Sequence, residues 1–357
     1  MADNEESSYR WMTNHGDGSF GTIRPEDDFL HLTGNPPGAS VTETYYFGFH
    51  VAEQAVHGYI YIWVHPNLRI VTAGAMISRG FQHAFLAADY CDIRAYLALD
   101  EQHDPITGVM RFPSGLTLTP IEAMGRWRLK LDAPALQTSF DLDARAAQPP
   151  IIRSDMKHLD QNMHVRGELV LRGRRHSVDC HQVRDRSWAN PRLEDPMPVP
   201  PYDWLCLTRG AEFSMNLSLF DDLRVLGDAG GVLRVPPKLL QDGWVALGAG
   251  PSAEQRRIVE VEKKTARTPD TLMPLRHEVT AIDDRGDRYE LIGESIGGCN
   301  WNGWPNMIWR QNLMRWTCNG AQCWGESQEV QWHETVRLLS RAPITTVAAT
   351  GNAPAER

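Results

Sequence analysis

The chain has 357 residues, of which 42% are hydrophobic and 23% are charged, and its formal net charge at pH 7 is −9. The sequence pI of about 5.8, with no basic stretch longer than RGRR at 172–175, argues against nucleic acid as a partner. No run of about 18 apolar residues could span a membrane, and the acidic start, MADNEESSYRW, is unlike a signal peptide. We therefore expect a cytoplasmic protein with room for two domains.

Short strand-like runs separated by Gly, Pro or Asn dominate the chain. They fall at 42–50, 58–64, 69–77, 93–99, 116–118, 126–131, 164–172, 177–183, 204–208, 213–220, 223–227, 257–264, 276–281, 288–292, 307–316 and 322–332. Many short strands with turn signals between them are typical of all-β sandwiches and barrels. We predict an all-β protein with two tandem β-domains at 25–150 and 151–342. A lead-in at 1–24 precedes them, a disordered tail at 343–357 follows, and Pro149-Pro150 is the domain linker.

The run from His176 to Trp204 is more polar than an ordinary strand, because histidine, arginine and aspartate gather between 181 and 186. His181 and Asp185 share one face of a strand, and such a pair can act as an acid and a base. An Asp–Arg ion-pair lock between two domains accounts equally well for the same residues.

Glu43 lies among aromatic residues in the strong early strand TETYYFGFH. Because burial among aromatics raises the pKa of a carboxyl group, Glu43 could donate a proton. Solvation at a barrel edge is the alternative. Tyr45 and Tyr46 point in opposite directions in a strand, so only one of them can face a given cavity.

Six of the twelve tryptophans fall between 301 and 332, namely Trp301, Trp304, Trp309, Trp316, Trp324 and Trp332. They either pack a β-core or line an aromatic cavity for a large apolar ligand. The segment 300–306, NWNGWPN, has the composition of a loop at a pocket mouth, although Asn and Gly are common in any turn.

Several cofactor and catalytic motifs are absent from the sequence. The thirteen histidines form no HExxH or HxH pattern and the six cysteines form no CxxC pair, so we expect reduced cysteines and no metal. GxxxxGK[ST] is missing too, and neither a GxSxG elbow nor GxGxxG lies at a strand–helix junction. Acid/base chemistry without a cofactor, or binding alone, is what remains.

Four segments together resemble one superfamily. The TETYYFGF run, the RGELVLRGRRHSV hairpin, the RDRSW motif at 184–188 and YDW at 202–204 are similar to the carotenoid 1,2-hydratase superfamily. That group includes AttH-like bacterial proteins and fungal lipocalin-like Diels–Alderases. The resemblance covers about residues 25–340. Many relatives carry glycine after the Ser-Trp pair, where this chain has Ala189, and the counterpart of their next arginine is Arg192.

The resemblance implies two lipocalin-like β-barrels, a hydrophobic pocket and chemistry without a redox cofactor. We expect a lyase or isomerase acting by acid/base catalysis on an isoprenoid or aryl-alkyl molecule, with a carrier of apolar molecules as the alternative and a homodimer left open. The motif residues carried over are Asp185, Ser187 and Trp188. The candidate catalytic residues are Asp185, His181, Glu43 and Tyr46, and the candidate substrate-binding residues are Tyr45, Trp188, Trp301 and Trp304.

Overall fold

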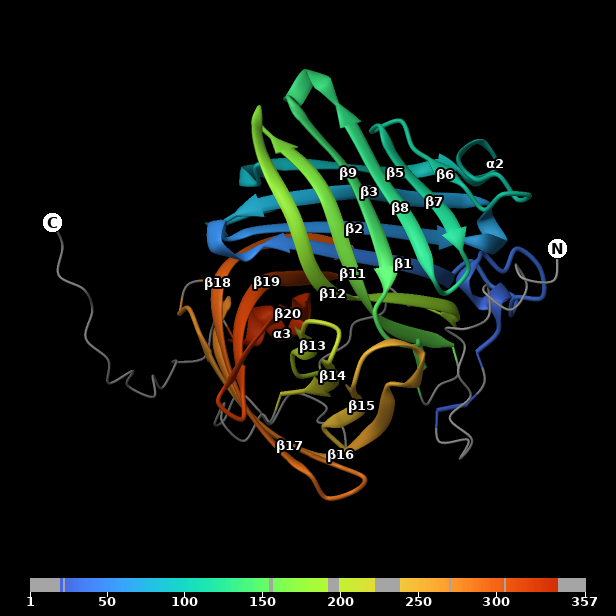
Figure 1. The fold of residues 1–357 in the computed structure, drawn as a ribbon. Coiled ribbons are helices and arrows are strands. Elements are labelled where there is room, and N and C mark those ends of the chain that lie inside the picture. Colours follow the sequence, from blue (N-terminus) through green and yellow to red (C-terminus); the bar gives the residue numbers. More distant parts are fainter. Residues whose placement is uncertain are drawn as a thin grey trace, which may run out of the picture.

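The computed structural model describes residues 20–21, 23–153, 157–191, 199–221, 238–269, 271–304 and 306–339. Most of this part of the chain is β-structure, arranged as two β-bodies that lie one above the other in Figure 1. The prediction of an all-β protein with two tandem β-domains is confirmed. The predicted strand at 223–227, Arg192 and the predicted tail at 343–357 lie outside the described residues.

The first body is a curled, open sheet built around the long strands β1 and β12. Its order is β5 (Tyr90–Ala98), β3 (Ile70–Arg79), β2 (Val56–His65), β1 (Val41–Val51), β12 (Arg174–Pro191), β11 (His158–Leu171), β9 (Thr138–Ala146), β8 (Arg126–Ala133), β7 (Leu116–Glu122) and β6 (Met110–Arg111), with β10 (Ile151–Ile152) paired to β11 and the short helix α2 (Leu99–Gln102) after β5. Alternation of buried and exposed side chains along β8 and β9 is the pattern of a sheet with one covered face.

The second body is an eight-stranded barrel, closed where β17 pairs with β18. Its strands are β13 (Tyr202–Arg209), β14 (Phe213–Phe220), β15 (Leu240–Leu247), β16 (Glu254–Arg267), β17 (Pro274–Asp283), β18 (Arg288–Trp304), β19 (Met307–Cys318) and β20 (Ala321–Trp332), followed by helix α3 (His333–Leu339). The first half of the chain adds β4 (Phe81–Gln82), which runs parallel to β18.

The change from one body to the other does not coincide with Pro149-Pro150. β11 follows these prolines yet pairs with β9, and β12 pairs with β1, so both strands belong to the first sheet. The prolines therefore mark a connection between strands of one sheet. The change of sheet falls between β12 and β13, inside the run that contains the RDRSW and YDW motifs.

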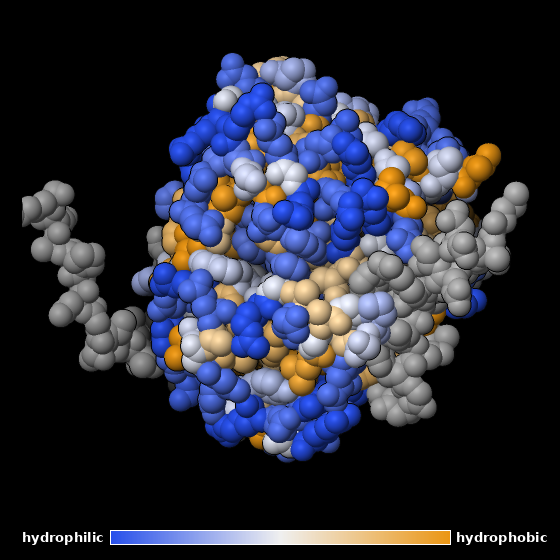
Figure 2. Space-filling view, in the orientation of Figure 1, coloured by the Kyte–Doolittle hydropathy of each residue, from blue (hydrophilic) through white to orange (hydrophobic). Residues whose placement is uncertain are grey.

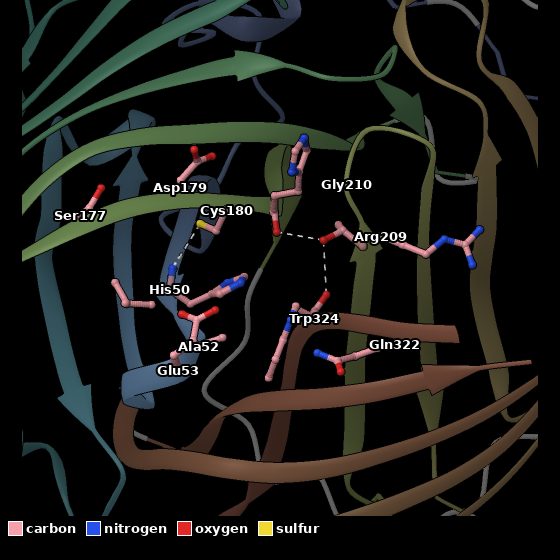
Figure 3. Close-up of a pocket in the computed structure, with 13 residues that line it drawn as sticks. His50, Ala52, Glu53, Ser177, Asp179, Cys180, Arg209, Gly210, Gln322 and Trp324 are labelled. Carbon is pink, nitrogen blue, oxygen red and sulfur yellow. Dashed lines mark hydrogen bonds between the residues drawn. The ribbon is translucent and has the colours of Figure 1, made fainter. Parts of the chain in front are cut away.

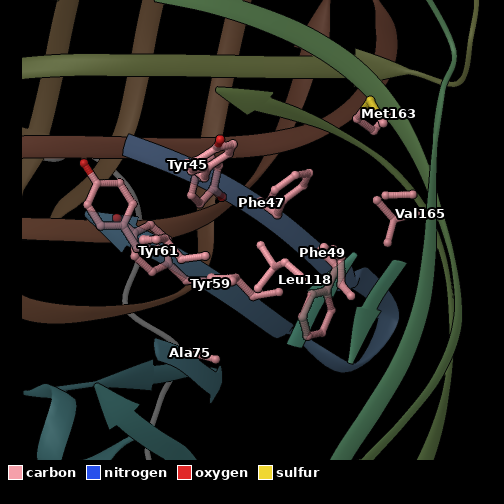
Figure 4. Close-up of a cluster of buried hydrophobic side chains, with 14 of the residues drawn as sticks. Tyr45, Phe47, Phe49, Tyr59, Tyr61, Ala75, Leu118, Met163 and Val165 are labelled. Atoms are coloured by element: carbon pink, nitrogen blue, oxygen red, sulfur yellow. The ribbon is translucent and has the colours of Figure 1, made fainter. Parts of the chain in front are cut away.

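Apolar side chains form two buried clusters. The larger fills the curl of the first sheet, where Phe47, Phe49, Leu118, Met163 and Val165 gather in Figure 4, and it continues into the contact between the two bodies. The smaller fills the barrel and includes Trp316. The visible surface is mainly hydrophilic, with scattered apolar areas (Figure 2). In the described part of the chain, no helix is both long and apolar enough to cross a bilayer.

Candidate functional site

A buried carboxylate joins the two bodies where β1 and β2 face β13 and β20. The Tyr46 hydroxyl donates to Glu326 Oε2 at 2.5 Å, and His57 Nε2 lies 3.0 Å from the same oxygen. Tyr46 and His57 come from the first sheet and Glu326 from the barrel, and all three side chains are buried. Two groups from neighbouring strands and a third, which is 280 and 269 residues away from them, thus share one hydrogen-bond network.

The second oxygen of Glu326 also has partners in the barrel wall. Gln328 Nε2 donates to Oε1 at 3.0 Å, and the Cys206 thiol lies 3.6 Å from it. Burial and the charge of Glu326 raise the pKa values of Tyr46 and Cys206 well above their ordinary values. Both groups therefore stay protonated and can donate to the carboxylate.

Gly48 is needed for this arrangement. A Cβ atom at this position would lie 2.3 Å from the Tyr46 hydroxyl oxygen and 3.0 Å from Gln182 Cγ. A glycine inside a strand often marks a close approach of another group, and here that group is the phenol of Tyr46. The FGF sequence in β1 is thus part of the site.

Aromatic rings continue the site along the same contact. The Tyr59 ring lies 5.6 Å from that of Trp301, the Tyr61 ring lies 5.1 Å from that of Trp309, and the two indoles lie 5.5 Å apart. Among the described residues, the indole N–H groups of Trp204, Trp301 and Trp309 have no hydrogen-bond acceptor, although all three side chains are more than nine-tenths buried. The contact therefore offers hydrogen-bond donors set in apolar walls.

A groove of about 470 Å³ opens at the other end of this contact (Figure 3). Its walls come from the end of β1 and its turn, from β12, from the β13–β14 hairpin and from β20. The side chains that line it include His50, Asp179, His181, Thr208, Arg209 and Trp324. This volume lies within the range of roughly 300–1,000 Å³ that is typical of small-molecule sites.

Strand register places the groove next to the buried carboxylate. Thr208 pairs with Trp324, and Cys206 pairs with Glu326 in the same antiparallel ladder, two residues earlier in β13 and two later in β20. On the first sheet His50, which lines the groove, pairs with His57, which contacts Glu326. Residues two apart in a strand share a face and are separated by about 7 Å. Glu326 is therefore about that distance from Trp324, which lines the groove.

Asp185 lies on a different part of the contact. His158 Nε2 is 3.7 Å from Asp185 and 3.6 Å from Asp160, which is the cross-strand partner of Asp185. Asp160 is also bound by Arg153 at 3.0 Å and accepts the indole N–H of Trp244 from β15 at 2.9 Å. This cluster therefore links the first sheet to the barrel.

The charges around His158 oppose one another. Burial and Arg153 lower the pKa of His158, but the nearby carboxylates of Asp160 and Asp185 outweigh them and leave that pKa above its ordinary value. Burial acts to raise the pKa of Asp160, and Arg153 outweighs it and lowers that pKa. These acidic groups and His158 could approach one metal ion, but Asp160 already binds Arg153 through both oxygens.

Glu43 lies inside the curl of the first sheet and forms an ion pair with Arg186, and both side chains are fully buried. Burial acts to raise the pKa of Glu43, but the Arg186 charge outweighs it and leaves the pKa below its ordinary value. The expectation of a raised pKa was therefore wrong, since the sequence did not indicate a guanidinium at this distance. Tyr45 packs under Arg186, whose Cζ is 4.3 Å from the ring centroid.

The remaining predicted residues are spread over the molecule. His181 lines the groove and stacks on His164 with 4.4 Å between centroids, and burial together with His164 lowers the pKa of His181 to about 4. Trp188 lies beside His31 at 5.3 Å, near Arg186. Trp301 belongs to the aromatic wall, and the side chain of Trp304 lies outside the described part of the structure.

A second group of charges lies in the barrel wall, where Asp203, Asp221 and Glu329 could also approach one metal ion. Lys263 contacts Asp203 and Asp221, and Arg267 contacts Asp221 and Glu329. A lysine and an arginine thus already bind these carboxylates, which is the usual condition for burying acidic groups.

Glu326, His57 and Cys206 were missed in the sequence. The available signal is the alternation in β20, where Glu326 and Gln328 follow Trp324 at every second position of an otherwise buried strand. Polar residues on a buried face must be paired, and that requirement alone marks Glu326 as a candidate.

Residues 24–334 match the family described as domain of unknown function DUF7064. The chain belongs to this family. A search of curated proteins gives no match.

Solved structures share the fold. An AttH-like protein from Nitrosomonas europaea is 13% identical, with a TM-score of 0.56 over 83% of this chain and 94% of that one. Kievitone hydratase from Nectria haematococca is 9% identical, with a TM-score of 0.50 over 90% and 96%. CghA, solved with Sch210972, is 10% identical, with a TM-score of 0.52 over 82% and 89%. The resemblance noted in the sequence is confirmed for the fold.

Proposed function

We propose that this DUF7064 protein is a lyase or isomerase that acts by acid/base catalysis on a hydrophobic small molecule of isoprenoid or aryl-alkyl type. The observation that carries the proposal is the Glu326 carboxylate, which is buried and shared between Tyr46 and His57 at the contact of the two bodies. A hydratase and a Diels–Alderase among the structural neighbours support it.

We assign the acid and the base to Glu326 and His57, whose Oε2 and Nε2 atoms are 3.0 Å apart. In a hydration, an acid gives a proton to one alkene carbon, water adds to the other carbon, and a base takes a proton back. One water is consumed, no electrons are exchanged and the enzyme is restored. General acid/base catalysis of this kind contributes about 10²–10⁴-fold to the rate.

Tyr46 is retained from the sequence prediction, as the donor that orients Glu326. We assign Asp185 and Glu43 to ion pairs that hold strands together, because each lies beside a cationic partner and away from Glu326. Trp301 keeps its predicted contact with the apolar part of the substrate.

The test is proton exchange at carbon in D₂O, followed by mass spectrometry over a panel of isoprenoid alkenes and alcohols and aryl ethers. Glu326→Gln keeps the size of the side chain and removes its charge, so turnover falls by about 10²-fold or more. Glu290→Gln, at an exposed position of β18, is the matched control and keeps wild-type turnover. Wild-type turnover in E326Q would overturn the proposal. If panel compounds bind but none of them exchanges protons at carbon, the protein is better described as a carrier.

A further inference from the structure

The wall of the groove in Figure 3 contains a buried histidine with a ring nitrogen that has no partner in the described part of the chain. His50 lines the groove from β1, and the His50 side chain is 5% exposed. Among the described residues, His50 Nδ1 has no hydrogen-bond partner, whereas the backbone N–H of His50 donates to Cys180 Sγ at 3.4 Å. A buried ring nitrogen without a partner is costly, so its place in a groove wall indicates a ligand group that satisfies it.

The two histidines of the groove are neutral at physiological pH. Burial and nearby His57 lower the pKa of His50 to about 3, and burial and His164 lower that of His181 to about 4. A neutral imidazole carries one donor and one acceptor. This combination matches a hydroxyl group, which also donates and accepts, better than it matches a carboxylate or an ammonium group.

The charged groups of the groove already have partners or lie at its edge. Asp179 is bound by His164 at 2.6 Å and Arg166 at 3.1 Å. The Arg209 guanidinium lies over the Phe213 ring at 5.4 Å, and Glu53 is exposed. The centre of the groove therefore has no free charge to select an ionic ligand.

Trp324 supplies the aromatic side of the groove. Its ring lies 6.4 Å from the His50 ring, tilted by 43°, and it is only partly buried. Thr208 is the cross-strand partner of Trp324. Its hydroxyl donates to backbone oxygens, those of His181 at 2.9 Å and Trp324 at 3.3 Å. An indole beside a neutral imidazole can hold a flat ring and its hydroxyl together.

We propose that this groove binds the hydroxyl-bearing ring of a neutral phenolic substrate, with His50 as the hydrogen-bond partner of the hydroxyl and Trp324 as the surface on which the ring packs. The inference rests on the proposed function, because it makes the substrate of the Glu326 centre an aryl-alkyl molecule. The ring occupies the groove, and the alkyl part points towards Glu326, which lies two residues from Trp324 on β20.

The test is ligand-observed NMR titration of the full-length protein with 4-methylphenol, with toluene, benzoate and benzylammonium as comparison probes. The phenol binds more tightly than the other three. His50→Ala and Trp324→Ala each weaken its binding by about tenfold, the loss expected for one hydrogen bond or one stacking contact. His65→Ala, the same substitution at the far end of β2, leaves binding unchanged.

Two further variants separate binding from folding. Trp324→Phe keeps an aromatic face and retains most of the affinity, and His50→Asn keeps a polar group in the buried position if His50→Ala fails to fold. Tighter binding of benzoate than of the phenol, or unchanged binding in W324A together with unchanged binding in H50A, would overturn the inference. If H50A does not fold, unchanged binding in W324A alone overturns it. Glu326→Gln binds 4-methylphenol like wild type, so loss of turnover in that variant with intact phenol binding separates the two proposals.

Discussion

Tyr46 and Asp185 are cross-strand partners on β1 and β12, yet they contribute to two separate contacts with the barrel. Tyr46 donates to Glu326 of β20, whereas Asp185 lies beside His158, whose neighbour Asp160 accepts the indole N–H of Trp244 from β15. Of this one residue pair, Tyr46 belongs to the candidate acid/base centre and Asp185 belongs to the ion-pair cluster around His158.

Tyr46→Phe tests the coupling between the sheet and the barrel. Loss of the hydroxyl leaves Glu326 with one donor fewer in a buried site, so the free energy of unfolding falls by about 1–3 kcal/mol. Turnover of the panel substrates falls too, because the carboxylate loses the group that orients it. Urea denaturation and deuterium exchange measure the two effects.

The matched control for Y46F is Tyr289→Phe, because the Tyr289 hydroxyl also donates to a carboxylate, that of Asp283, at 2.9 Å in the barrel. It loses stability by a similar amount and keeps turnover. Equal losses of turnover in both variants would assign the effect of Y46F to stability alone.

Asp185→Asn tests whether Asp185 has a structural role in the ion-pair cluster of His158, Asp160 and Asp185, which we call the lock. The readout is the protonation of His158. The pKa of His158 is raised because Asp160 and Asp185 outweigh burial and Arg153. The stability that the imidazolium contributes is complete below its ordinary pKa of about 6.5 and disappears as pH rises through the raised value. In D185N this pKa falls towards the ordinary value, and the loss of stability moves to lower pH.

NMR titration of the His158 ring, assigned with His158→Asn, measures the pKa directly, and urea denaturation at several pH values measures its effect on stability. Catalytic turnover in D185N stays close to wild type, because Asp185 pairs with His158 within the first sheet. An unchanged His158 pKa in D185N would contradict the lock, and loss of turnover in a stable D185N protein would return Asp185 to the acid/base centre.

Glu43→Gln tests whether Glu43 is a structural partner. The substitution leaves the fully buried Arg186 without its carboxylate, and breaking a buried pair from one side costs about 3–5 kcal/mol. The double variant Glu43→Gln/Arg186→Met removes the stranded charge and recovers much of that loss. Thermal and urea unfolding measure the stability of both variants. Phenol binding in the groove stays the same in both. A stable E43Q protein without turnover would assign Glu43 to catalysis.

The strands could be predicted because their signal is local. The TETYYFGFH run becomes β1 and the Ser177–Val183 run becomes part of β12, since apolar and β-branched or aromatic residues between turn signals suffice. The pairing of strands could not be predicted in the same way. Pro149-Pro150 has the composition of a linker, but β11, which follows it, pairs with β9 and therefore belongs to the first sheet.

The site depends on contacts that no local pattern contains. Tyr46 was a candidate, but its partner Glu326 is 280 residues away, and Arg186 is 143 residues from Glu43. Alternation in a strand tells which residues share a face, and it does not tell which strand covers that face. Glu43 and Tyr46 were therefore assigned to one cavity, although they face opposite sides of the first sheet.

Ala189→Gly tests the backbone conformation of the residue that follows the RDRSW motif. Ala189 has φ of 52°, and the pairing of β1 with β12 shifts between Thr42 and Thr44, so that Trp188 and Ala189 stand opposite Glu43. This is a β-bulge with a left-handed residue, a position that usually takes glycine. A left-handed alanine costs about 1–2 kcal/mol, and the greater chain entropy of glycine offsets about 0.5–1 kcal/mol of that.

The expected result for A189G is a gain of about 0.5–1 kcal/mol in the free energy of unfolding, measured by urea denaturation. Ala189→Val, whose branched side chain tolerates this conformation least, is destabilised. Gln137→Gly is a matched control, because Gln137 has a φ of 49° in the turn before β9 and gains stability for the same reason. A loss of stability in A189G, with a gain in Q137G, would mean that the Ala189 methyl group contributes packing next to Trp188 that outweighs the backbone strain.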